Sequence, residues 1–265
     1  MDDLLIGSPD VQADYSESQI FDDNCAVCAE TSIINQFLPD GGLGQEEAAY
    51  VSTQNGWYMP GVGTPQADMG NLMELYGIDN HSVTDASIEQ LAQELQQGHG
   101  VIVSVNSSQL WGEGPLHELM DFICKAFGFD TSQWSPADHA ISVTGIDVSD
   151  PSNPQVIIND SGMPTNAGAG ASYPLDKFLD AWENSDFSYT ATDAPLPSLS
   201  GAEGFDSQMW GDFDWNPWIS DAAGVIGTIA YTAITDDPET GALVGVVTKQ
   251  ITSELLNNED FARSI

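Results

Sequence analysis

Hydrophobic and polar positions in the first half of the chain recur at the spacing of helices. The run CAVCAETSIINQFL, Cys25–Leu38, mixes apolar and small side chains at this spacing, and PDGG follows it, so we expect a helix that begins at Cys25. Similar patterns predict helices at Gln45–Thr53, from Thr64 to Gly77 and from Asp85 to Gly98. The last pattern is the clearest, because its apolar residues form one stripe that a glycine ends.

The pattern changes period in the second half of the chain. Strands are predicted at Gly100–Val105, His139–Asp147 and Gln155–Gly162, and Tyr173–Trp182 is typical of a strand end followed by a short helix. The segment VSDPSNP is rich in turn residues, so the second and third of these strands are expected to form a hairpin. Helices followed by strands predict an α+β fold, in which N-terminal helices pack on an antiparallel sheet.

The composition shifts near residue 190. Pro, Ser and Gly dominate Asp193–Gly204, which is typical of a linker. Beyond it lie the Trp-rich segment MWGDFDWNPW and two apolar runs, Val225–Ile234 and Ala242–Ile251, which suit a β-hairpin or a pair of helices. We therefore expect a main domain over residues 1–192, and a linker with a C-terminal appendage over residues 193–265. The Trp side chains either pack this appendage or bind a substrate or partner.

The charge balance excludes one class of partner. The chain has 265 residues with 41 Asp and Glu against 4 Lys and Arg, a formal net charge of −37. Such a surface repels the phosphates of DNA and RNA, so no nucleic-acid partner is expected. The acidity is typical either of a halophile protein, where salt screens the repulsion, or of an acidic protein from an ordinary setting, including an exported one.

Two observations bear on where the protein acts. The N-terminal segment MDDLLIGSPDVQADYSESQ lacks the basic start and the long apolar core of a secretory signal. The longest apolar stretch, Ala222–Thr235, is too short and too rich in Gly and Thr to span a bilayer. The default location is therefore cytoplasmic, with export by a non-classical route left open. The sequence leaves the oligomeric state open as well.

The pair Cys25 and Cys28 raises three chemical alternatives. Its C-x-x-C spacing suits a redox dithiol, half of a metal site, or one reactive cysteine beside a packing residue. A metal clip needs two further ligands, and the sequence has no second C-x-x-C, so we expect no metal and no cofactor. The odd count of three cysteines also argues against a disulfide framework.

Other residues complete the third alternative, in which Cys25 is a nucleophile. A thiolate in the first turn of a helix is stabilised by the helix dipole. His139 opens a strand and is the candidate base, and the expected hairpin brings Asp160 to the same end, where it can orient the imidazole. Gln19 lies six residues before Cys25 and has a side-chain amide that can donate to an oxyanion.

The order and spacing of these residues resemble the papain-like cysteine peptidases of the C39 type, in particular stand-alone members without an ABC-transporter part. The resemblance rests on Gln19-x5-Cys25 before a helix, on HAISVTG from His139, and on Asn159-Asp160. It covers about residues 19–182. It implies a papain-like fold, a triad of Cys25, His139 and Asp160 with Gln19 at the oxyanion, and no cofactor.

The resemblance also implies an activity. A cysteine peptidase of this kind hydrolyses peptide or amide bonds through a thioester, and its partner is a peptide or protein substrate. The same machinery serves an amidase, or an acyl transferase when an amine replaces water. An effector or toxin on this fold, and a binding module that has lost catalysis, are the competing functions.

Overall fold

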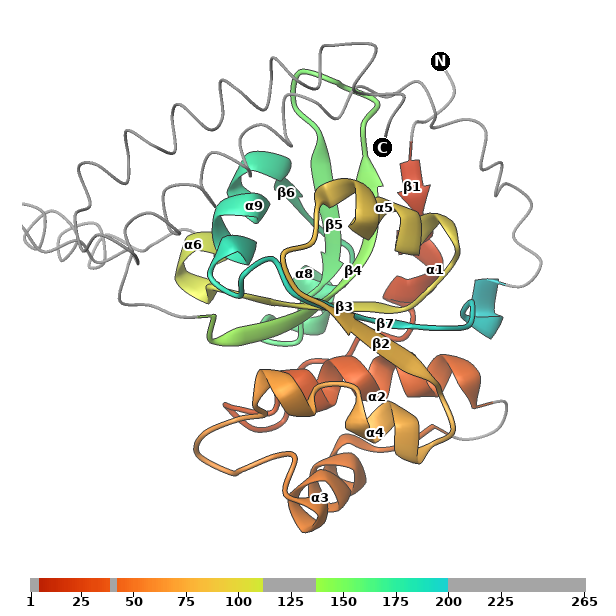
Figure 1. Ribbon diagram of the computed structural model, residues 1–265, viewed down its shortest axis with the longest axis vertical. Coiled ribbons are helices and arrows are strands. Elements are labelled where there is room, and N and C mark those ends of the chain that lie inside the picture. The colour runs from red at the N-terminus through yellow and green to blue at the C-terminus, as the bar shows by residue number, and fades with distance from the viewer. Residues whose placement is uncertain (1–4, 39–41, 112–136, 200–265) are drawn as a thin grey trace, which may run out of the picture. The chain divides into compact units, whose positions relative to one another are not determined.

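The structure is a computed structural model that describes residues 5–38, 42–111 and 137–199 (Figure 1). Two compact units divide the chain, and the first holds all of the described residues except Ser87–Glu89. The Trp-rich segment and the two apolar runs expected near the C-terminus lie outside the described residues, so their structure stays a prediction. Within the described residues, no helix is long and apolar enough to cross a membrane.

One antiparallel sheet forms the centre of the first unit, with strand order β2-β7-β3-β4-β5-β6 and β1 paired to β4 on the side. The strands are β1 Leu5–Gly7, β2 Asn80–Val83, β3 Val101–Val105, β4 His139–Asp147, β5 Gln155–Asn159, β6 Ala171–Pro174 and β7 Tyr189–Thr192. The β4–β5 hairpin predicted from the turn-rich segment is confirmed, and β3 pairs with β4 so that Val105 lies opposite His139.

Helices surround this sheet. They are α1 Pro9–Ala13, α2 Cys25–Phe37, α3 Gln45–Asn55, α4 Asn71–Leu75, α5 Ile88–Gln96, α6 Ser107–Trp111, α8 Thr165–Gly168 and α9 Leu175–Glu183, with 3-10 turns η1 Gln66–Asp68 and η2 Pro197–Leu199. Figure 1 shows α2, α3 and α4 grouped below the sheet, apart from α6 and α9. The α+β class, with N-terminal helices packed on an antiparallel sheet, is confirmed.

Helix α2 is the central helix of the lower group because its apolar face packs directly on the sheet. Val27, Ile33 and Ile34 are buried in one core cluster with Ile102 of β3 and Ala140 of β4. The close approach depends on a glycine before β3: a Cβ at position 100 would lie 3.1 Å from side-chain carbons of Ile33. This packing fixes the first turn of α2 against the start of β4.

The helix expected from Thr64 to Gly77 is wrong over its first half. Gly70 has φ +98°, and a Cβ there would lie 2.2 Å from the side-chain oxygen of Asn80. The Asn80 amide donates to the Gly70 carbonyl at 3.1 Å, so this left-handed residue is held by a hydrogen bond as well as by space. The chain therefore forms η1, a turn at Gly70 and the short helix α4.

The start of the expected linker also differs from the prediction. Residues 189–192 form strand β7 between β2 and β3, and the segment after it stays on the domain. Leu196 is fully buried and Leu199 is 7% exposed, both in the core cluster that contains α2. Residues 193–199 are thus part of the main domain, while the boundary of the appendage beyond them stays a prediction.

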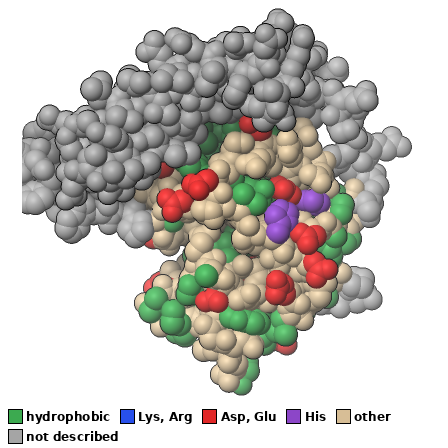
Figure 2. Space-filling view, viewed as in Figure 1, with side chains coloured by type: hydrophobic (Ala, Val, Ile, Leu, Met, Phe, Trp, Pro, Cys, Tyr) green, Lys and Arg blue, Asp and Glu red, His purple; other side chains and the backbone are tan. Residues whose placement is uncertain are grey.

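The described surface is acidic over several elements. Figure 2 shows Asp and Glu side chains distributed over the described part of one face. Within the described ranges Lys177 is the only Lys or Arg, and its ammonium lies 5.6 Å from the centre of the Tyr173 ring. The acidic character predicted to exclude nucleic acid therefore extends across this domain.

Helix α2 carries one acidic side chain, and it lies inside the core. Glu30 of α2 is 2% exposed, and its Oε2 accepts from the backbone N–H groups of Leu72 and Met73, at 3.1 and 3.3 Å, at the start of α4. Burial raises the pKa of Glu30 to about 7, although these N–H donors and that of Gly70 act in the opposite direction. The carboxyl therefore links α2 to backbone N–H groups in the first turn of α4, which have no hydrogen-bond acceptor within that helix.

Replacing this carboxyl gives a pH-dependent change in stability. In the folded state the pKa of Glu30 is about 7, against an ordinary value of 4.5, so the folded protein keeps a proton that the unfolded chain has lost. The free energy of unfolding therefore falls as pH rises between these values, by about 3 kcal/mol in total. Glu30→Gln removes this loss, and its stability relative to the native chain should rise by that amount between pH 4.5 and 8. Urea unfolding of both proteins across this range measures the difference, and a pH-independent difference would contradict the assignment.

Candidate active site

Cys25 is the first residue of α2, as the sequence predicts. The loop before it is held by buried amides: the side-chain oxygen of Asn24 accepts from the N–H of Phe21 at 3.1 Å, and that of Gln45 accepts from the N–H of Ile20 at 3.2 Å. Asn24 is fully buried, and its carbonyl accepts the first helical hydrogen bond from Cys28 at 2.9 Å. The loop therefore presents the Cys25 thiol at the N-terminus of a fixed helix.

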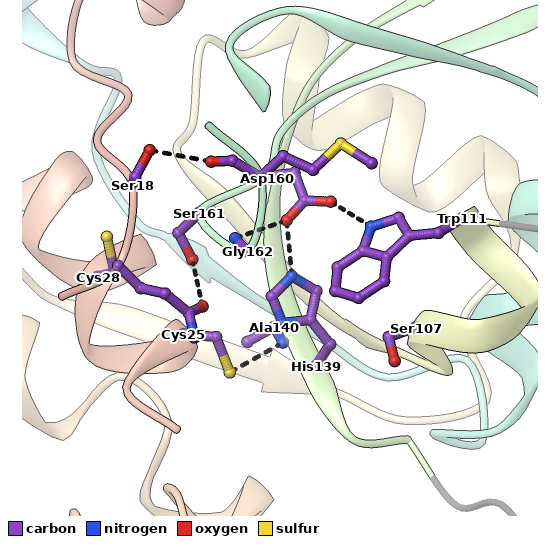
Figure 3. Close-up of polar contacts among 12 residues, drawn as sticks. Ser18, Cys25, Cys28, Ser107, Trp111, His139, Ala140, Asp160, Ser161 and Gly162 are labelled. Carbon is purple, nitrogen blue, oxygen red and sulfur yellow. Dashed lines mark hydrogen bonds and ion pairs between the residues drawn. The ribbon is translucent and has the colours of Figure 1, made fainter. Parts of the chain in front are cut away.

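His139 is placed beside this thiol by the sheet. It is the first residue of β4 and is 8% exposed. The next residue, Ala140, donates its backbone N–H to Cys25 Sγ at 3.4 Å. Figure 3 shows the thiol and the imidazole on facing elements, α2 and β4. Two residues more than a hundred positions apart in sequence are thus neighbours.

Asp160 follows β5 and is 1% exposed. Its Oδ1 lies 2.7 Å from Nε2 of His139 and accepts from the N–H of Gly162 at 2.9 Å. Its Oδ2 accepts from Nε1 of Trp111 at 2.6 Å (Figure 3). Because Nε2 of the imidazole is bound to Asp160, Nδ1 is the ring nitrogen left to exchange a proton with the thiol.

Electrostatics at this site favour an ion pair. Burial by itself raises the pKa of Cys25, but the hydrogen bond and positive charge of His139, with the N–H groups of Ala140 and Ala26, outweigh it and lower the pKa below its ordinary value. Burial lowers the pKa of His139, yet the hydrogen bonds to Asp160 and Cys25 raise it to about 10. With the thiol pKa lowered and the imidazole pKa raised, the proton resides on the imidazole near neutral pH.

Asp160 stays ionised for the same reason. Burial raises its pKa, but the hydrogen bond and charge of His139, with the donors Trp111 and Gly162, lower it below the ordinary value. A carboxylate that accepts several hydrogen bonds keeps its charge even when it is buried. These pKa shifts favour a thiolate at Cys25, an imidazolium at His139 and a carboxylate at Asp160.

Gln19 is fixed to the strand end that carries Asp160. Its backbone N–H donates to the carbonyl of Ser161 at 2.8 Å, and its side-chain oxygen accepts from the Ser161 hydroxyl at 3.2 Å. The side-chain nitrogen donates to the carbonyl of Phe21 at 2.9 Å. An amide nitrogen carries two hydrogens, so one remains after this bond. Its expected role at the oxyanion stays a prediction.

Cys28 has the surroundings of a packing residue. It is 1% exposed, its thiol donates to the carbonyl of Glu17 at 3.4 Å, and burial raises its pKa to about 12. Figure 3 shows the two sulfur atoms of Cys25 and Cys28 pointing in different directions. Both thiols are free, and no cluster of three or more His, Cys, Asp or Glu suited to a metal occurs among the described residues.

The other two described histidines, His81 and His99, lie in polar surroundings. His99 is 8% exposed, with Nδ1 2.6 Å from Glu94, and His81 lies in β2 with Nδ1 2.7 Å from Asp193. Both therefore have carboxylate partners of their own in this part of the chain. His117 lies outside the described residues, as does Cys124.

Trp111 is the site residue that the sequence did not reveal. Its indole N–H bonds Asp160, and its ring centre lies 5.2 Å from that of His139 with the planes at 60°. Nothing in its local pattern, SSQLW, distinguishes it from an ordinary helical Trp. Only the contact between the end of α6 and the end of β5, far apart in sequence, reveals it.

Comparison with known proteins assigns the family. The model of the peptidase C39-like family matches residues 23–190, well over half of the chain, with Cys25, His139 and Asp160 inside the match. The chain therefore belongs to the peptidase C39-like family, as the resemblance predicts. The papain-like assignment of its α+β fold follows from this membership.

The relatives and solved structures that match share only limited sequence identity with this chain. An uncharacterized protein of Mycobacterium tuberculosis is 29% identical, over 68% of this chain and 81% of its own, and one from Mycobacterium bovis matches equally. A Bacillus anthracis protein described as a C39-like peptidase has a TM-score of 0.47 at 14% identity, covering 71% of this chain and 96% of its own. The peptidase domain of Streptococcus ComA, a bifunctional ABC transporter involved in quorum sensing, has a TM-score of 0.43 at 16% identity, covering 68% and 98%. The family match, not these structures, carries the assignment.

Proposed function

We propose that the protein is a cysteine peptidase in which Cys25 is the nucleophile, His139 the acid and base, and Asp160 the residue that orients the imidazole. The observation that carries the proposal is the gathering of the three side chains: the N–H of Ala140, next to His139, reaches Cys25 Sγ at 3.4 Å, and Nε2 of His139 lies 2.7 Å from Asp160 Oδ1. Family membership supports the same activity. A binding module without catalysis has no need to keep a thiol of lowered pKa beside a buried imidazole.

The first half of the reaction forms a thioester. The Cys25 thiolate attacks the carbonyl carbon of the scissile bond, and the carbonyl oxygen takes the negative charge. The backbone N–H of Cys25 and the remaining N–H of the Gln19 side chain are the proposed donors to that oxygen. The His139 imidazolium then gives its proton to the departing amine, and the C–N bond breaks.

The second half returns the enzyme to its starting state. The neutral imidazole of His139 accepts a proton from water, whose oxygen attacks the thioester carbonyl. The C–S bond breaks, the carboxylic acid leaves, and the proton on His139 again pairs with the Cys25 thiolate. Asp160 keeps its charge throughout and holds Nε2 of the ring, so Nδ1 faces the reaction in both halves.

The proposed partner is a peptide or protein substrate. The same steps with an amine in place of water give acyl transfer, and with a small amide give an amidase. Delivery of this activity as an effector or toxin remains an alternative use of the same site. The common requirement is a reacting carbonyl at Cys25.

Hydrolysis of a peptide library at low and at high salt tests the proposed activity. Cleavage by the full chain, with products mapped by mass spectrometry, is the expected result, and it should vanish in Cys25→Ala. Activity that rises with salt would indicate adaptation to high salt, because salt screens the self-repulsion of a chain with net charge −37. Cleavage that persists in Cys25→Ala would contradict the proposal.

A further inference from the structure

The short helix α6 brings Trp111 onto the site. It begins directly after β3, where the Asn106 side chain accepts from the N–H of Gln109 at 3.0 Å. Ser107 donates its N–H and its hydroxyl to the carboxylate of Asp138, at 2.8 and 3.0 Å. Because Asp138 directly precedes His139, these two bonds fix the start of α6 to the strand end that carries the imidazole.

Trp111, at the other end of α6, completes the hydrogen bonding of Asp160. Oδ1 of this carboxylate is taken up by His139 and Gly162, and Oδ2 accepts from Trp111 Nε1 at 2.6 Å. Donors on both oxygens fix the rotation of the carboxylate about its χ2 bond, which is otherwise broad. Trp111 therefore sets the direction in which Oδ1 faces the imidazole.

The indole ring also covers the bond between His139 and Asp160. Its centre lies 5.2 Å from that of the imidazole, while 38% of Trp111 remains exposed, so one side contacts the ring and the other faces outward. Gly162 backs both rings: a Cβ there would lie 2.9 Å from Trp111 and 3.1 Å from His139. Excluding water from a charged hydrogen bond strengthens it, because the local dielectric falls.

We infer that Trp111 is a positioning residue of this active site, which acts through Asp160 to hold His139 as the imidazolium partner of Cys25. The inference rests on the proposed function and deepens it. It assigns a task to both parts of the side chain: the N–H aligns the carboxylate, and the ring shields its bond to the imidazole.

If the carboxylate of Asp160 is no longer aligned with the His139 ring, it stabilises the imidazolium less. A less well directed carboxylate lowers the pKa of His139 from its raised value, and the thiolate of Cys25 then loses part of its partner charge. The pKa of Cys25 should therefore rise as that of His139 falls, so the pH range over which the ion pair exists narrows from both ends. A residue with only a packing role would change stability but leave this range unchanged.

The test compares the full chain with Trp111→Phe, which keeps an aromatic ring and removes the N–H. The rate of Cys25 alkylation by iodoacetamide, followed by mass spectrometry from pH 5 to 10, reports the thiolate without requiring a peptide substrate. On the acid side of the profile, where the thiolate is only partly formed, the rate should fall about tenfold, as expected for a lost hydrogen bond to a charged group. Turnover of a cleaved peptide should show the same fall in kcat with KM little changed.

Two further variants keep the result interpretable. Gly162→Ala places a methyl group against the indole and should shift the alkylation profile in the same direction. Trp57→Phe, the same substitution after α3, should superimpose on the native profile. If Trp111→Phe also superimposes while the native protein reacts rapidly at pH 6, the inference about Trp111 is overturned and the proposed function stands. If native Cys25 itself reacts as an ordinary thiol, the proposed function fails, and this inference with it.

Discussion

Replacing Cys25 with serine should reduce peptide turnover by about 10⁴-fold or more, the scale on which loss of an activated nucleophile acts. A serine hydroxyl at this position keeps the size of the side chain but ionises far less readily than a thiol. The hydrogen bond and charge of His139 lower the pKa of the Cys25 thiol, but they cannot make a serine hydroxyl ionise near neutral pH. Steady-state hydrolysis of a library-derived peptide measures the effect.

A matched control is available one helical turn away. Cys28 is buried, and burial raises its pKa to about 12, so Cys28→Ser changes a thiol that is protonated at neutral pH. Its turnover should stay within a few-fold of the native value. A large loss of turnover in Cys28→Ser, together with a small loss in Cys25→Ser, would contradict the assignment of Cys25 as the nucleophile.

Replacing Asp160 with asparagine should lower turnover at pH 8 on the order of 10²-fold. The carboxylate is the leading cause of the raised pKa of His139, which is about 10. Without its charge the imidazolium loses its proton at lower pH, nearer the ordinary value of 6.5. The amide also brings a donor group toward either Trp111 or His139, both of which donate to Asp160 now.

The pH profile identifies this cause. In the native protein the alkaline limit of activity should follow the imidazolium, and in Asp160→Asn this limit should move to lower pH while the acid limit changes less. Asp150→Asn is the control, since Asp150 is an exposed turn residue bonded to Ser152. If the alkaline limit of the Asp160→Asn profile is unchanged, Asp160 is not the cause of the raised pKa of His139.

Cys25, His139 and Asp160 could be predicted from the sequence as candidate site residues. Cys25 follows from the helix pattern after it, and the pairing of His139 with Asp160 follows from two strands around a turn-rich segment. In both cases the signal is local, because the period of the apolar residues and the turn between them lie within a few residues of the side chain. The hairpin then converts local signals into a contact across 21 residues.

Other parts of the fold depend on contacts that no local pattern encodes. Strand β2, with sequence NHSV, is short and half exposed, and it exists because it pairs with β7 more than a hundred residues later. Leu196 looked like part of a linker because Pro and Ser surround it, yet it fills the core beside α2. Trp111 belongs to the same class, since its role is set by the approach of α6 to the end of β5.

The pairing of the Cys25 thiolate with the His139 imidazolium is tested most directly by the reactivity of Cys25 toward a thiol-directed electrophile at acidic pH. Iodoacetamide should modify Cys25 selectively over Cys28 at pH 6, as mapped by peptide mass spectrometry. His139→Ala should abolish this reactivity while leaving the fold intact by circular dichroism. Reaction of native Cys25 only as pH approaches the ordinary thiol pKa of 9.0, or an unchanged rate in His139→Ala, would contradict this pairing.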